Sequence, residues 1–101
     1  MRGKRVDGIG EQYIPRLDIG DFGKDADGNW WVRPPKEGCA GTMITGISAN
    51  ADWRVIEHED GTITVSPSIG IPKVKKGKDF DEIVPGWQYH GFLEHGVWRK
   101  C

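Results

Sequence analysis

The sequence has no long apolar run and almost no net charge. No stretch of the 101 residues approaches the roughly 18 apolar residues that cross a membrane, and no signal-peptide core follows Met1. The 14 Lys and Arg residues nearly balance 15 Asp and Glu residues, giving a formal net charge of −1. A strongly basic face, as in proteins that bind duplex nucleic acid, is therefore not expected. We expect a cytosolic protein without a duplex nucleic-acid or membrane partner.

The sequence also has few residues that bind metal, and they are badly spaced for it. The candidate ligands are Cys39, His58, His90, His95 and Cys101, and none of them forms a Cys-x-x-Cys or His-x-x-x-His pair. A structural zinc site usually draws its four ligands from such close-spaced pairs. We therefore expect no metal or cofactor. Both thiols should be reduced in the cytosol, although spacing alone leaves a disulfide between them open.

Catalytic signatures are absent as well. The chain contains no Gly-x-Ser-x-Gly elbow, no P-loop and no Gly-x-Gly-x-x-Gly motif that opens a helix. A triad can be written from Ser66 or Ser68 with His90 and an acidic residue, but triads are recognised by geometry, which a sequence does not give. Binding is therefore expected in preference to catalysis.

Turn-forming residues are abundant and helical periodicity is missing. There are 15 Gly and six Pro residues, which favour tight turns, and no window of 11 residues or more has a sustained 3.6-residue period. The length suits one domain. We expect a mainly β fold: a small antiparallel sheet, barrel or sandwich built from hairpins, with at most one short helix. Residues 1–12 should form a flexible basic arm and 13–101 the single β domain.

Two hairpins are the clearest local features. Residues 53–58 and 62–66 flank a turn at Asp60-Gly61, and residues 87–93 and 97–100 flank a turn at His95-Gly96. Weaker strands are predicted at 30–33 and 42–47, and an edge strand is predicted from Tyr13. Residues 72–86 are predicted to form a long loop with one helical turn at 79–83, and loops of that length are often functional.

Aromatic and basic residues alternate in three places. The pairs are Trp31 with Arg33, Trp53 with Arg54, and Trp98 with Arg99. An indole beside a cation can stack a nucleobase while the cation meets a phosphate. The alternative, left open by the sequence, is that the five tryptophans simply build a small core.

Three segments carry a resemblance to a known family. They are DGNWW at 27–31, DGTITVSPSI at 60–69, and Gly86-Trp87 followed by HGFLEHGVW at 90–98. Together they resemble a family of short, uncharacterised bacteriophage and bacterial proteins that pair a DGT-x-T-x-SPSI segment with a later WHG-[FY]-L-x-x-GVW segment. In that family the Trp and His are adjacent, whereas here Gln88-Tyr89 lies between Trp87 and His90. The resemblance implies a phage protein of the host cytoplasm that binds a host protein or a small signalling molecule of host defence.

These observations lead to a ranked set of hypotheses. The first is a small binding protein, expected to be a homo-oligomer because of its strand edges and tryptophans, which sequesters an anionic, nucleotide-like ligand and so counteracts host defence. An interaction module that inhibits a host protein is the alternative, and a His90-dependent hydrolase is the second alternative. The predicted ligand-binding residues are Arg54, Ser66, Ser68, Trp87, His90 and Arg99.

Overall fold

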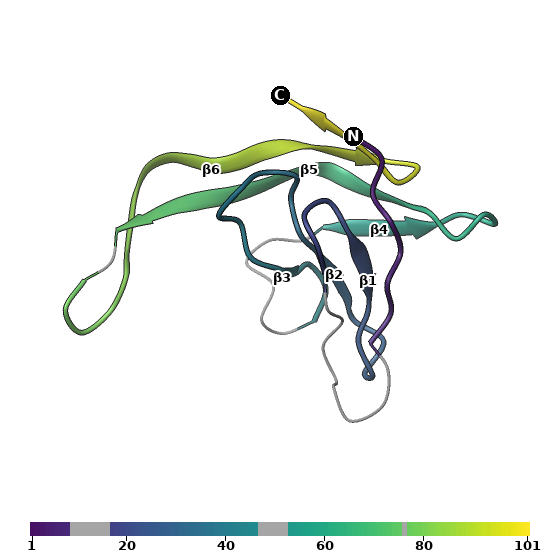
Figure 1. Ribbon diagram of the computed structural model, residues 1–101, viewed down its shortest axis with the longest axis horizontal. Coiled ribbons are helices and arrows are strands. Elements are labelled where there is room, and N and C mark those ends of the chain that lie inside the picture. Colours follow the sequence, from purple (N-terminus) through teal and green to yellow (C-terminus); the bar gives the residue numbers. More distant parts are fainter. Residues whose placement is uncertain (9–16, 47–52, 76) are drawn as a thin grey trace.

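The protein is built from two antiparallel sheets. The computed structural model describes residues 1–8, 17–46, 53–75 and 77–101. The smaller sheet has the order β1 (Phe22–Lys24), β2 (Trp30–Val32), β3 (Thr42–Met43), and the larger has the order β4 (Arg54–Glu57), β5 (Ile63–Lys75), β6 (Glu82–Glu94), β7 (Val97–Lys100) (Figure 1). The mainly β prediction is confirmed. The described residues contain no helix long and apolar enough to span a membrane.

The two predicted hairpins are confirmed, and both belong to the larger sheet. β4 and β5 flank the turn that contains Asp60-Gly61, with Arg54 opposite Ser66 and Glu57 opposite Ile63. β6 and β7 flank the turn at His95-Gly96, with Leu93 opposite Trp98. Glycines with positive φ stand at both turns, as tight reversals require.

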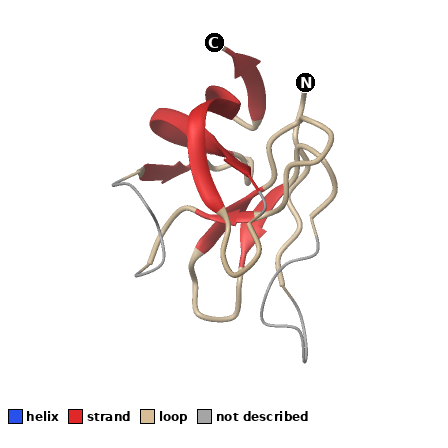
Figure 2. Ribbon diagram, turned by 90° about the vertical axis from the view of Figure 1, so that its left-hand side faces the viewer, coloured by secondary structure: helices blue, strands red, loops and turns tan. Residues whose placement is uncertain are grey.

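The predicted loop at 72–86 and its helical turn at 79–83 are wrong. β5 and β6 each continue for 13 residues, and their far halves pair so that Val74 lies opposite Ile83. The segments around Val74 and Ile83 do alternate in polarity, but Pro72 and Pro85 interrupt both patterns. Proline is tolerated here because both far halves are edge strands. β4 covers β5 only as far as Ser66, and β7 covers β6 only over Gly91–Glu94. Viewed end-on, the ribbon of β5 and β6 is strongly twisted (Figure 2).

The smaller sheet was predicted only in part. β2 and β3 fall within the predicted strands at 30–33 and 42–47, whereas β1 was not predicted. Three residues, of which one is glycine, are too few to produce a pattern. The strand expected from Tyr13 and the end of the one expected at 42–47 lie outside the described residues.

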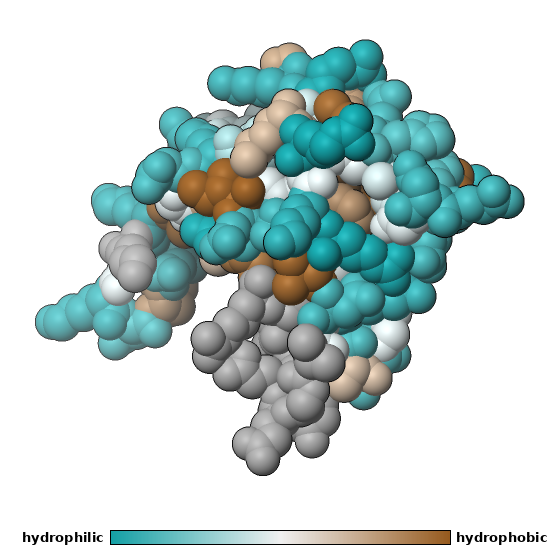
Figure 3. All heavy atoms as spheres, turned by 45° about the vertical axis from the view of Figure 1, so that its right-hand side comes forward, coloured by the Kyte–Doolittle hydropathy of each residue, from teal (hydrophilic) through white to brown (hydrophobic). Residues whose placement is uncertain are grey.

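One core lies between the two sheets. It contains Phe22, Trp30 and Val32 from the smaller sheet and Ile63, Val65, Ile69, Tyr89, Leu93 and Trp98 from the larger, with Cys39 and Ile44 from the connecting segments. The indole of Trp98 meets Tyr89 edge-on, with 5.6 Å between ring centroids, and its Nε1 donates to the carbonyl of Gly20 at 2.6 Å. Two tryptophans of the five are therefore sealed in the core. Figure 3 shows that apolar atoms also reach the surface, as a patch within a mostly hydrophilic face.

Residues 1–8 connect the two sheets through backbone hydrogen bonds. The carbonyl of Met1 accepts from the amide of Trp98 at 2.7 Å, and the amide of Gly3 donates to Gly96 at 2.7 Å. Further along, the amide of Val6 donates to Phe22 at 2.8 Å. The loose arm predicted at 1–12 thus gives way to an ordered segment over its described part, because backbone groups of β7 and β1 are available to pair with it.

The expectation that the protein forms a homo-oligomer stays a prediction.

A cluster of charges holds this segment against both sheets. The guanidinium of Arg5 lies 2.7 Å from the carboxylate of Glu57, and the ammonium of Lys24 lies 3.3 Å from it. These cations hold the pKa of the Glu57 carboxyl below its usual value. Both cations also stand about 5 Å above the ring of Trp30, at 5.0 and 4.9 Å. Arg5 thus reaches Trp30 from a distant part of the sequence, whereas Lys24 is the cross-strand partner of Trp30 in the β1–β2 hairpin.

Tyr89 offers a direct test of the core. Its hydroxyl is buried with no hydrogen-bond partner in the part of the chain that the structure describes, and burial raises its pKa. A buried hydroxyl left unpaired costs about 1–3 kcal/mol. We expect Tyr89→Phe to leave the free energy of unfolding unchanged or to raise it, as measured by urea denaturation. Leu93→Ala, in the same strand, should lower it by about 2–5 kcal/mol. A Tyr89→Phe protein as unstable as Leu93→Ala would show that the hydroxyl is paired.

Candidate functional site

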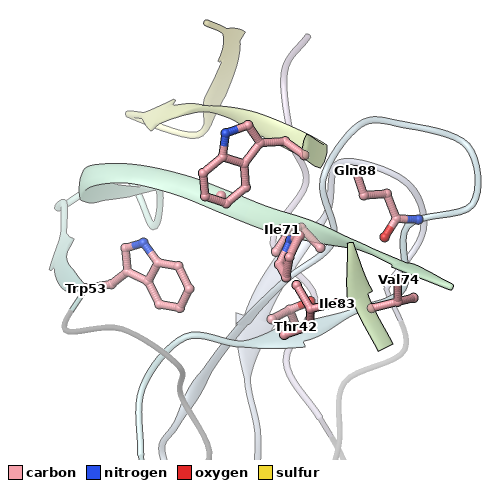
Figure 4. A pocket seen from close by; sticks show the side chains of 9 residues that line it. Thr42, Trp53, Ile71, Val74, Ile83 and Gln88 are labelled. Carbon is pink, nitrogen blue, oxygen red and sulfur yellow. The ribbon is translucent and has the colours of Figure 1, made fainter. Parts of the chain in front are cut away.

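An apolar groove opens where the far half of the ribbon leaves the core. Its volume is about 580 Å³, within the range of small-molecule sites. We call it the ribbon groove, and its lining residues are Thr42, Trp53, Gly70, Ile71, Pro72, Val74, Ile83, Trp87 and Gln88. In Figure 4, Trp53 stands at one end and Val74 and Gln88 stand at the other, with Ile71, Ile83 and Thr42 between them. β3, the chain before β4, and both long strands thus contribute to one site.

Apolar and polar side chains alternate along the far halves of β5 and β6, and the apolar ones line the groove. Val74 and Ile83 are opposite one another in register and so share one face of the ribbon. They line the groove while 51% and 75% exposed. Lys73 and Lys75 flank Val74 and therefore point to the other face. The far half of the ribbon is thus amphipathic, with its apolar face toward the groove.

The two indoles of the groove are held in different ways. Trp53 is half-buried against the core, and its Nε1 donates to the carbonyl of Ser68 at 2.7 Å. Trp87 is 53% exposed and lies across Gly70, where a Cβ atom would come within 2.7 Å of the indole. Glycine at position 70 is therefore what lets the Trp87 ring settle onto the strand. Both rings are positioned before any ligand arrives.

A bulge brings Trp87 to His90. Simple alternation would place these two side chains on opposite faces of β6. The register passes from Ile71 opposite Tyr89 directly to Pro72 opposite Trp87, so Gln88 is an extra residue on β6. The ring centroids of Trp87 and His90 lie 5.0 Å apart with 30° between planes. The bulge thus brings the Trp87 and His90 rings into contact.

Three of the six predicted ligand-binding residues come together. Trp87 lines the groove, and beside it the Oγ of Ser68 lies 3.1 Å from Nε2 of His90. The other three lie elsewhere. Arg54 and Ser66 are exposed partners on β4 and β5, and Arg99 is exposed, paired with Glu94 and placed over the ring of Phe92.

Sequence reasoning missed most of the lining. Ile71, Pro72, Val74 and Ile83 were assigned to a loop or left unassigned, and Thr42 and Gln88 carried no signal of their own. Trp53 is predicted to begin a strand beside Arg54 or to join the core, with no groove expected from it. The available signal was the apolar residue between Lys73 and Lys75, which is typical of an amphipathic strand.

One cation, Lys36, adjoins the groove at Gln88 and is not itself part of the lining. The Nζ of Lys36 donates to the carbonyl of Gln88 at 2.6 Å, and the side-chain amide of Gln88 donates to the carbonyl of Gly38 at 3.0 Å. Nearby, Arg33 donates to the carbonyls of Leu17 and Cys39. Within the described ranges neither cation belongs to an ion pair. Their charge is therefore not neutralised by a carboxylate there.

The groove and its surroundings combine an apolar lining with one polar pair, Ser68 and His90. Ser68 and His90 are at nucleophile–base distance, but a catalytic histidine also needs a group that orients it. In the described segments His90 has no side-chain hydrogen bond other than that with Ser68, and no cluster of metal-ligating residues is found among them. The groove itself offers two indoles, aliphatic side chains and two polar groups, those of Thr42 and Gln88.

Gly70→Ala tests the placement of Trp87. The added methyl group overlaps the indole, so the ring should move away from the strand and from His90. We expect the ring-proton NMR signals of His90 to lose the shift that the neighbouring indole imposes. Gly41→Ala is the control, at a glycine without a positive φ where the added Cβ would meet nothing closer than the Leu17 side chain at 3.7 Å. Unchanged His90 signals in Gly70→Ala would contradict this geometry.

Comparison with known proteins adds no relative: family models, curated proteins and solved structures all give no match to this chain.

Proposed function

We propose that this protein is a binding module that captures a small molecule with a flat ring in the ribbon groove. The observation that carries the proposal is that Trp53 and Trp87 line one apolar groove of about 580 Å³. Ligand sites are typically hollows of about 300–1,000 Å³ lined by apolar and aromatic side chains with a few polar groups.

Stacking on the indoles would supply most of the affinity. Stacking of a base on an aromatic side chain contributes about 1–3 kcal/mol. The cost of ordering the site is small because Trp53 is fixed by Ser68 and Trp87 rests on Gly70. The Gln88 side chain, already hydrogen-bonded to Gly38, adds a polar group of fixed position.

The proposed ligand carries an acidic group next to its ring. The ammonium of Lys36 has three donors, and one is used by the carbonyl of Gln88. The remaining donors can meet a phosphate or carboxylate of a ligand that extends past Gln88. This keeps the anionic, nucleotide-like ligand expected from the sequence, but assigns its charge to Lys36 in place of Arg54 and Arg99. The role in sequestering a host-defence signal rests on the resemblance alone and stays a prediction.

Calorimetric titration with adenosine 5′-monophosphate and adenosine as probes tests the proposal. Trp87→Ala should weaken binding of both probes by about 5- to 100-fold, the equivalent of one lost stacking contact. Lys36→Gln should weaken binding of the monophosphate and leave adenosine unaffected. The matched control is Phe80→Ala, because Phe80 is 71% exposed and lies outside the groove lining.

Two outcomes would contradict the proposal. The first is that neither probe binds and that no member of a wider panel of ring compounds with acidic groups binds either. The second is an equal loss of affinity in Phe80→Ala and Trp87→Ala, which would mean that the groove does not select the ligand.

A further inference from the structure

The larger sheet turns one face to the core and the other to solvent. Val65, Tyr89, Leu93 and Trp98 point into the core. Because side chains alternate along a strand, their neighbours in β5, β6 and β7 point the opposite way, and none of these neighbours is a buried side chain. We call this solvent side of the sheet the outer face. Its side chains include Arg54, Ser66, Ser68, His90, Phe92 and Arg99.

Aromatic rings form a row on β6, a central strand of this sheet. His90 and Phe92 are two residues apart and therefore share the outer face. Trp87 joins them through the bulge at Gln88, with its ring centroid 5.0 Å from that of His90. Aromatic side chains on an open four-stranded sheet are a common platform for single-stranded nucleic acid, because unpaired bases stack on them.

An arginine on each outer strand of the sheet flanks this row. Arg99 on β7 is opposite Phe92, and its guanidinium stands 5.1 Å from the centroid of that ring. The carboxylate of Glu94 holds the guanidinium in place, and a base can stack on a guanidinium plane as it does on a ring. On the other side of the row, Arg54 of β4 is exposed and lies opposite Ser66.

The outer face is positive although the chain as a whole is not. Over the paired parts of β4–β7 it carries Arg54 and Arg99 against one carboxylate, Glu94, whereas the net charge of the chain is −1. The hydroxyls of Ser66 and Ser68 lie between Arg54 and the rings and can donate to phosphate or sugar oxygens. Rings in the middle and donors on both sides match a strand in which flat bases alternate with phosphates.

We propose that the outer face binds single-stranded nucleic acid. Bases stack on His90 and on the Phe92–Arg99 pair, and phosphates lie near Arg54. Duplexes are excluded because their bases are already stacked on one another. The outer face and the ribbon groove meet at Trp87 but are otherwise separate, so this proposal does not depend on a ligand in the groove.

Fluorescence anisotropy with labelled oligodeoxyuridylate and oligouridylate, each about 12 nucleotides long, tests the proposal. At least one strand should bind, and a preference between them reports contact with the 2′-hydroxyl. Either strand annealed to its complement should bind more weakly. Phe92→Leu, which keeps an apolar side chain without a flat ring, should weaken binding about 5- to 100-fold. Arg54→Gln should weaken binding and reduce its dependence on salt, since one phosphate contact is lost.

Two controls separate this surface from its surroundings. Lys75→Gln removes an exposed cation from the far half of the ribbon, outside the outer face, and should leave strand binding unchanged. Phe92→Leu should leave the affinity for adenosine 5′-monophosphate unchanged, because Phe92 does not line the groove. The proposal is overturned if neither strand binds, if Phe92→Leu and Arg54→Gln both bind as the wild type does, or if Lys75→Gln weakens binding as much as Arg54→Gln.

Discussion

The pairing of β5 with β6 is the contact on which the rest of this structure depends. Each strand has 13 residues, and no other strand pair in the described chain is longer than four. Its near half supplies Val65, Ile69 and Leu93 to the core, and its far half continues past the strands on either side. The ribbon groove exists because the apolar face of the ribbon continues beyond the ends of the flanking strands β4 and β7.

Irregularities in this pairing determine which side chains meet. A regular β6 would point Trp87 and His90 to opposite faces, and a side chain at position 70 would displace the indole. The bulge at Gln88 and the bare backbone of Gly70 together place an aromatic ring at the groove. The site thus depends on departures from ideal strand geometry, which are frequent next to functional sites.

The sequence predicted those features that are encoded locally. Asp60-Gly61 and His95-Gly96 signal their turns directly, and Ile63 and Val65 alternate with polar residues, so both hairpins could be found. The far half of the ribbon could not, because prolines interrupt its alternation and only the partner strand shows that they lie on open edges. Of the predicted ligand-binding residues only Trp87 lines the groove, and Ser68 and His90 lie beside it. The rest of its lining comes from segments that only tertiary packing brings together, and the contact of Arg5 with Trp30 arises in the same way.

The central claim is that the far half of the ribbon is a paired, twisted extension whose apolar face forms the groove. Cross-strand NMR contacts between the backbones of Val74 and Ile83 test it most directly, because these residues are opposite one another in the register. The account predicts strong contacts between the two, together with extended-chain contacts along β5 and β6. Sequential amide–amide contacts of a helical turn at 79–83, with no contact between Val74 and Ile83, would contradict it and remove the groove.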